Sequence, residues 1–191
     1  MENIIKVLFL ASDPSDASRL HLGRELKVIR EKLDHNKLFD IKDNPATTPK
    51  DLMDQITNYQ PQIVHFSGHG SADGELCFED ELGKSKTISP EALASFFSIA
   101  KDYVKCVVVN TCFSEKQAKA ISQHIPVVVG TKKEISDDAA INFSSGFYTA
   151  LNPDLSTENF NKAFGLGLVA IQFDETWKNI LPLLLSSVQL N

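Results

Sequence analysis

Two short segments of the sequence carry side chains suited to nucleophilic chemistry. His69 and Gly70 follow an apolar run in "PQIVHFSGHG", and Cys112 follows a second apolar run in "VKCVVVNTC". A cysteine attacks carbonyl carbon as its thiolate, and an imidazole can take the thiol proton and later return it. Brought close together, the two side chains would form a nucleophile and its general acid/base.

Apolar strands that alternate with amphipathic helices must position these residues. The helix expected after the first strand has apolar residues spaced four, three and four apart, at Leu22, Leu26, Ile29 and Leu33. Continuous apolar runs predict strands buried on both faces at residues 4–12, 61–67, 104–110 and 125–131. The alternation indicates an α/β protein whose mostly parallel sheet is covered by helices on both faces. Near the C-terminus we expect a helix and then an edge strand around Pro182.

The ends of two strands define the expected site. The hairpin-like segment 74–88 and the helix that follows it would return the chain, so strands 61–67 and 104–110 can lie parallel and adjacent. Functional sites of such sheets gather at the carboxyl ends of the strands. His69 and Cys112 are therefore expected on neighbouring loops.

A helix is expected directly after Cys112, at residues 114–124. The unpaired N–H groups and the dipole at a helix N-terminus stabilise a thiolate. Those N–H groups, together with the N–H of Gly70, would also bind a developing oxyanion. Gly70 has no Cβ, so a substrate carbonyl can approach its backbone closely.

Other readings of these residues are open or weaker. A cysteine at a strand end is more often a small buried residue than a nucleophile, and we assign no role to Cys77 or Cys106. His65 is interpreted as a core residue. The glycines of segment 68–74 resemble a dinucleotide loop, but a strand-like segment follows them where a helix is required. No metal site is expected, because the histidines lack a third ligand nearby.

Composition narrows the class of protein. The 191 residues, 42% of them apolar, suit a single domain over residues 1–191. A net charge of −6 without a basic cluster argues against nucleic acid or an anionic membrane surface as a partner. The apolar N-terminal run is too short to span a membrane and lacks the pattern of a signal peptide. Three cysteines are typical of a reducing compartment, so a cytoplasmic location is expected.

Several segments resemble the CHAT family, caspase-like cysteine proteases of clan CD. They are "ASDPSDASRLHLGREL", "IVHFSGHG", "VVVNTCFSEKQAKAI" and "VVVGTKKEISDDAAINFSSGFYTAL", and they span nearly the whole chain in this order. The histidine precedes the cysteine by 43 residues (112 − 69), near the roughly 50 of caspases. The helix in the last segment points to CHAT domains in particular.

The resemblance implies a caspase/haemoglobinase-like three-layer fold and hydrolysis of peptide bonds through an acyl-enzyme. Carried over by position, Cys112 is the nucleophile, His69 the general acid/base, and Gly70 and Cys112 supply the oxyanion N–H groups. Caspase-like enzymes often lack a third residue that orients the histidine, and none is named. No cofactor is implied.

The resemblance says less about specificity and regulation. Relatives that cleave after basic residues place acids in the S1 pocket, and Asp13 and Asp137 are the candidates for that position. The alternative for both is a helix cap or a solvated turn, and for Asp137 capping is favoured. An apolar S1 pocket is the other option.

CHAT domains are commonly fused to or partnered with regulatory modules. We therefore expect a protein substrate and a regulatory module or activating partner chain, in antiphage defence or regulated cell death. Two alternatives are a catalytically idle interaction module and a TIR-like, nucleotide-responsive domain.

Overall fold

A six-stranded sheet forms the centre of the computed structural model, which describes residues 4–71, 73–173 and 182–186. The strand order is β2-β1-β3-β6-β7-β8, and only the β7–β8 pair is antiparallel. The strands are β1 (Ile5–Ser12), β2 (Phe39–Asn44), β3 (Ile63–Gly68), β6 (Cys106–Asn110), β7 (Val127–Thr131) and β8 (Pro182–Ser186). The predicted edge strand at Pro182 is confirmed; the helix expected before it falls largely on residues 174–181, which lie outside the described residues.

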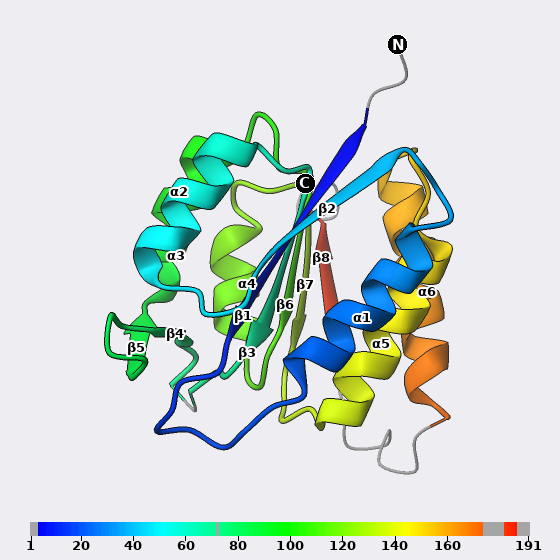
Figure 1. Cartoon of the computed structure of the whole chain (residues 1–191). Helices are drawn as coiled ribbons and strands as arrows, with labels where there is room; N and C mark the ends of the chain where they lie inside the picture. The colour runs from blue at the N-terminus through cyan, green and yellow to red at the C-terminus, as the bar shows by residue number, and fades with distance from the viewer. Residues whose placement is uncertain (1–3, 72, 174–181, 187–191) are drawn as a thin grey trace.

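Helices cover both faces of the sheet, as Figure 1 shows. One face carries α1 (Leu22–Leu33), α5 (Asp137–Ala150) and α6 (Thr157–Ile171), and the other carries α2 (Pro49–Tyr59), α3 (Pro90–Ala100) and α4 (Glu115–Ile121). Successive β1 residues alternate between two buried apolar clusters, with Val7 and Phe9 in one and Leu8 and Leu10 in the other. This alternation explains why the central strands are continuous apolar runs. The predicted three-layer α/β arrangement is confirmed.

The β3–β6 connection contains the predicted hairpin. Strands β4 (Leu76–Glu79) and β5 (Ser85–Ile88) pair antiparallel, and α3 then returns the chain to β6. Strands β3 and β6 are parallel neighbours, with Ser67 opposite Asn110. Two residues beyond that pair come His69 and Cys112, so the predicted adjacency of the two strand ends is confirmed. Within the described residues, no helix has the length and apolar character needed to cross a membrane.

Candidate active site

The loops that carry His69 and Cys112 touch through their backbones. A Cβ added to Gly70 would lie 2.0 Å from the carbonyl oxygen of Cys112 and 3.2 Å from Thr111 Oγ1. Any side chain at residue 70 would therefore push the two loops apart. The glycine next to His69 is what lets the nucleophile loop lie against it.

Gly70→Ala is expected to separate the loops and to lower the free energy of unfolding by about 1–3 kcal/mol, the usual cost of overpacking. The matched control is Gly165→Ala in α6, where an added Cβ meets nothing within 4 Å. That change should stabilise the protein by about 0.4–1 kcal/mol. Urea unfolding of both variants measures the difference, and equal midpoints would contradict the close approach.

Hydrogen bonds to the end of β7 hold the Cys112 loop in place. Ser114 Oγ donates to Val109 O at 2.9 Å and accepts the Thr131 N–H at 2.9 Å. Thr131 Oγ1 donates to Thr111 O at 2.6 Å. Phe113 turns the chain sharply, with a φ of 52° in the left-handed region.

The helix expected after Cys112 is present and begins within one residue of the expected start. Helix α4 starts at Glu115, three residues beyond Cys112, and has seven residues. The left-handed turn at Phe113 separates Cys112 from the first turn of this helix. Cys112 Sγ instead donates to Ile135 O at 3.7 Å.

The contacts of His69 determine which ring nitrogen carries the proton. Nε2 lies 2.9 Å from the carbonyl oxygen of Ser18, which can only accept a hydrogen bond. Nε2 is therefore the protonated nitrogen of the neutral ring, and Nδ1 retains the lone pair. Among the described residues Nδ1 has no hydrogen-bond partner, so it is available as a base.

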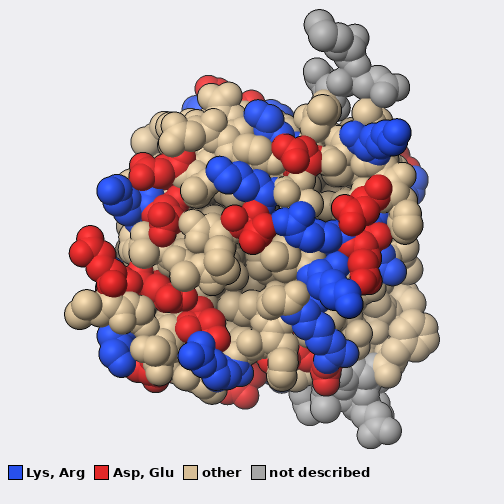
Figure 2. Space-filling view, in the orientation of Figure 1, with Lys and Arg blue, Asp and Glu red and all other residues tan. Residues whose placement is uncertain are grey.

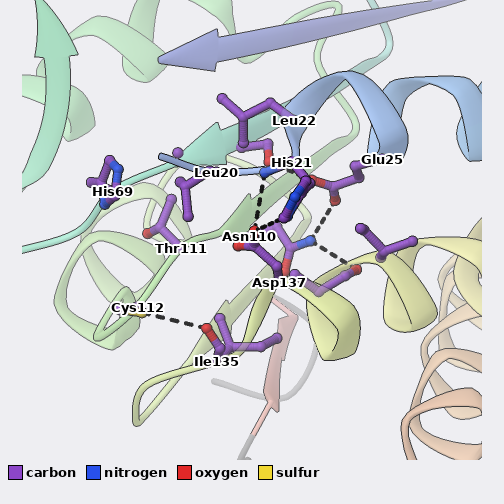
Figure 3. Close-up of a pocket in the computed structure, with 14 residues that line it drawn as sticks. Leu20, His21, Leu22, Glu25, His69, Asn110, Thr111, Cys112, Ile135 and Asp137 are labelled. Atoms are coloured by element: carbon purple, nitrogen blue, oxygen red, sulfur yellow. Dashed lines mark hydrogen bonds and ion pairs between the residues drawn. The ribbon is translucent and has the colours of Figure 1, made fainter. Parts of the chain in front are cut away.

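A small cavity of about 40 Å³ is lined by both His69 and Cys112. Figure 3 shows them on adjoining loops, with the sulfur of Cys112 turned toward Ile135. No hydrogen bond links the two side chains in this arrangement. Such bonds are often long in resting enzymes and form only when substrate is bound.

Asp137 lies in the wall of this cavity, on the far side from His69 (Figure 3). Its Oδ2 accepts the backbone N–H of His21 at 3.0 Å and lies 2.8 Å from His21 Nδ1. The favoured reading of Asp137 as the cap of its own helix is wrong: Ser136 caps α5 by accepting the Ala139 N–H. Asp137 instead joins the start of α5 to the residue before α1.

Asp13 does not line the cavity that contains Cys112 and Asp137. It lines a second cavity of about 340 Å³, which shares Leu20 and Leu22 with the first but includes neither His69 nor Cys112 among its walls. Its carboxylate faces His69, with Oδ1 3.7 Å from Nε2. The structure therefore does not bring Asp13 and Asp137 into one pocket, and their roles in S1 stay predictions.

A buried carboxylate that was not expected from the sequence lies at the base of the site. Glu25 of α1 lines the cavity, and its Oε1 accepts from His65 Nε2 at 3.1 Å, Asn110 Nδ2 at 2.5 Å and Ser144 Oγ at 2.6 Å. Its Oε2 accepts from Ser67 Oγ. Glu25 thus links α1 to β3, β6 and α5. Its contacts on β3 and β6 include Ser67 and Asn110, which lie two residues before His69 and Cys112 respectively.

Charge and hydrogen bonding keep this buried carboxyl ionised. Burial acts to raise the pKa of Glu25, but the charge of His65 and the hydrogen bonds from His65, Ser144 and Ser67 outweigh it and leave the pKa below 4.5. A signal was present in the sequence, because Glu25 lies on the apolar face of its helix between Leu22 and Ile29. The interpretation of His65 as a core residue is confirmed, since it is fully buried and stacks on Phe9.

The other two cysteines differ from Cys112 in their surroundings. Cys106 is buried in β6, and burial raises the pKa of its thiol well above the usual range. Burial, and then the charges of Glu75 and Asp16, raise the pKa of Cys77. Both therefore carry less thiolate at neutral pH than an ordinary cysteine, in line with the absence of an assigned role.

Comparisons with known proteins bear on the fold. The solved structure of gingipain R, an Arg-specific cysteine proteinase, matches with a TM-score of 0.61 at 12% identity, over 93% of this chain and 46% of that chain. Gingipain is caspase-like. The chain has a caspase-like fold.

Sequence comparisons point to proteases. The chain is 31% identical over 156 residues to a probable protease of Gillisia limnaea, and 31% identical over 159 residues to a Roc-COR-CHAT protease of an unknown prokaryotic organism. Each match takes in 76% of this chain but only 26% and 15% of the two relatives. No model of a protein family matches. The chain therefore corresponds in length to a minor part of these larger proteins.

Proposed function

We propose that the chain is a cysteine endopeptidase domain in which Cys112 attacks the peptide carbonyl and His69 moves the protons. The observation that carries the proposal is the placement of these residues on touching loops at the ends of β3 and β6. Relatives named as proteases and the caspase-like fold support it. The dyad assignment itself rests on the chemistry of the two side chains.

The geometry suits a thiol mechanism with a defined proton path. Rotation of Cys112 away from Ile135 O would turn its sulfur toward His69, whose Nδ1 accepts the thiol proton. The thiolate then attacks the carbonyl carbon, and the imidazolium passes the proton to the leaving amine. Water, deprotonated by His69, cleaves the acyl-enzyme and releases the new carboxylate.

Two backbone N–H groups are proposed to hold the oxyanion. Among the described residues, the N–H groups of Gly70 and Cys112 donate to no protein acceptor. They belong to loops in van der Waals contact, so both can point toward one oxygen atom. Pre-positioned donors of this kind stabilise the charge that develops in the tetrahedral intermediate.

The specificity pocket is proposed to be the cavity beside Cys112. Its walls include the apolar side chains of Leu20, Leu22 and Ile135, and its polar lining includes Asp137. The cavity of about 40 Å³ would have to widen by a movement of His21 away from Asp137; a basic P1 side chain could then bring its stem against the apolar wall and its charge to Asp137. Acidic side chains also gather beside the β4–β5 hairpin (Figure 2), where four acidic residues and two lysines line a depression: Asp51, Glu79, Asp80, Glu81, Lys50 and Lys86. Both features favour a basic peptide segment as substrate.

A protein substrate and a separate regulatory partner or module are part of the proposal. A Roc-COR-CHAT protease, by its name, couples such a domain to further modules, and the present chain corresponds to 15% of that relative. Cleavage of a specific protein partner in a bacterial defence or cell-death pathway is the setting we propose. A nucleotide-responsive role is less consistent with the structure, because the segment 68–74 leads into strand β4 and not into a helix.

Peptidyl acyloxymethyl ketones with P1 Arg, Lys, Leu or Asp test the proposal. These electrophiles label an active cysteine at a rate that depends on the P1 residue. We expect labelling of Cys112, read by peptide mapping, with Arg or Lys fastest in the wild type and with that preference reduced in Asp137→Asn. Loss of labelling in His69→Ala completes the expected pattern. Equal labelling of Cys77 and Cys112 would contradict it and favour an idle module.

A further inference from the structure

The register of β1 against β3 brings Asp13 to the side of His69. Ser12 is paired with Gly68, so the next residue of each parallel strand, Asp13 and His69, leaves the sheet at the same level. Asp13 Oδ1 lies 3.7 Å from His69 Nε2, the nitrogen that donates to Ser18 O. The carboxylate therefore faces the side of the imidazole ring opposite the free Nδ1.

Asp13 is held firmly in this position. Its backbone N–H donates to Glu79 Oε1 at 3.0 Å, and its Oδ2 accepts from Arg19 Nη1 at 3.0 Å. Its other oxygen, Oδ1, is buried and has no hydrogen-bond partner among the described residues. Burying an acceptor in this way is costly. The protonated Nε2 of His69 lies 3.7 Å from this oxygen.

We propose that Asp13 is a positioning residue for His69, which orients the ring and stabilises its protonated form; this inference rests on the proposed function. When Nδ1 takes the proton of Cys112, the ring becomes a cation beside a carboxylate at 3.7 Å. A slight tilt turns that contact into a hydrogen bond from Nε2. A flipped ring would direct a C–H group at Asp13 and Ser18 O, so the carboxylate also selects the ring orientation that presents Nδ1.

The positive charge of Arg19 offsets little of the attraction between the Asp13 carboxylate and the protonated His69 ring. Its side chain is 77% exposed, whereas that of Asp13 is 17% exposed. Solvent screens the attraction of an exposed guanidinium. The partly buried carboxylate therefore acts on His69 with most of its charge.

Alkylation of Cys112 by iodoacetamide at pH 7 tests the inference without a known substrate. The variants are Asp13→Asn, Asp13→Glu, His69→Ala and the control Asp43→Asn, with Cys77 and Cys106 as references in each sample. Asp43 lines the same cavity as Asp13 but pairs with Arg30. The rate reports the thiolate fraction of Cys112 and hence the stability of the thiolate–imidazolium pair.

We expect Asp13→Asn to slow alkylation of Cys112 about 10-fold, less than the loss in His69→Ala. Asp43→Asn should stay within about 2-fold of the wild type, and Asp13→Glu should recover most of the rate. Neither the alkylation rate of Cys77 nor the melting temperature should vary among the variants in the same order as the alkylation rate of Cys112. Asp13→Asn could also have a lower melting temperature. In that case an alkylation rate restored in Asp13→Glu supports the role of Asp13 in positioning His69, and a rate that stays low in Asp13→Glu overturns it.

Two further outcomes separate the inference from the proposed function. If His69→Ala slows the alkylation of Cys112 but Asp13→Asn reacts at the same rate as Asp43→Asn, only the role of Asp13 is overturned. A His69→Ala variant that reacts as fast as the wild type would overturn the Cys112–His69 dyad, and the role of Asp13 with it.

Discussion

Cys112→Ala is expected to lower kcat/KM on a cleaved peptide by roughly 10⁴-fold or more, and His69→Ala by roughly 10²–10⁴-fold. The first removes the only atom that forms the acyl-enzyme; the second removes the group that takes and returns the proton. Because the two act as a unit, the double variant should be no slower than Cys112→Ala alone. Initial rates at substrate concentrations above and below KM measure these effects.

Cys77→Ala is the matched control for the thiol, because Cys77 is half buried in β4 and its pKa is raised. We expect its kcat/KM to stay within about 2-fold of the wild type, as for surface changes away from a site. A loss in Cys77→Ala comparable with that in Cys112→Ala would contradict the assignment of the nucleophile. Additive losses in the Cys112–His69 double variant would contradict the dyad.

Glu25→Ala is expected to lower the free energy of unfolding by roughly 3–5 kcal/mol, the usual cost of removing one partner of a buried charged pair. The truncation leaves His65 Nε2, Ser67, Asn110 and Ser144 without their shared acceptor in a site closed to solvent. A domain is stable by only about 5–15 kcal/mol, so the loss is a large fraction. Urea unfolding provides the measurement.

The control for Glu25 is Glu31→Ala on the same helix. The side chain of Glu31 is 59% exposed and, within the described part of the chain, forms an ion pair only with Lys27, at 3.8 Å, so we expect a change within about 0.5 kcal/mol. Equal urea midpoints for the two variants would show that the buried network does not anchor the site.

The same carboxyl predicts a dependence of stability on pH. The pKa of Glu25 is lower in the folded state than its usual 4.5, so its contribution is present above that pH and is lost as the pH falls through the folded pKa. The wild type should therefore lose stability below about pH 4.5, and Glu25→Ala should lose less over the same interval.

The sheet and the placement of the dyad could be predicted because they depend on local patterns. Strands buried on both faces are continuous apolar runs, and the hairpin and helix between β3 and β6 allow only a few connections. His69 and Cys112 each lie two residues beyond Ser67 and Asn110, the last pair that joins β3 to β6, so the strand ends alone bring them to one edge. The positions of residues at strand ends can therefore be predicted without knowing how the side chains pack.

The remaining contacts of the site depend on which helices pack together. Asp137 reaches His21 across 116 residues of sequence, and Glu25 reaches Ser144 across 119. No periodic pattern in the sequence indicates either contact, because both arise from the packing of α1 against α5. The turn between Cys112 and α4 could not be predicted either, because the left-handed conformation of Phe113 is unusual for a bulky residue. An acidic residue on an apolar helix face, as at Glu25, is the one signal that could have been used.

Cleavage of a diverse peptide mixture, read by mass spectrometry, tests the central claim most directly. Wild type, Cys112→Ala and His69→Ala are incubated with the same mixture, together with Cys77→Ala as the active control. We expect new termini in the wild type and Cys77→Ala samples that are absent from the other two, with a shared P1 residue that is Arg or Lys. Cleavage that persists in Cys112→Ala, or that is lost only in Cys77→Ala, would contradict it.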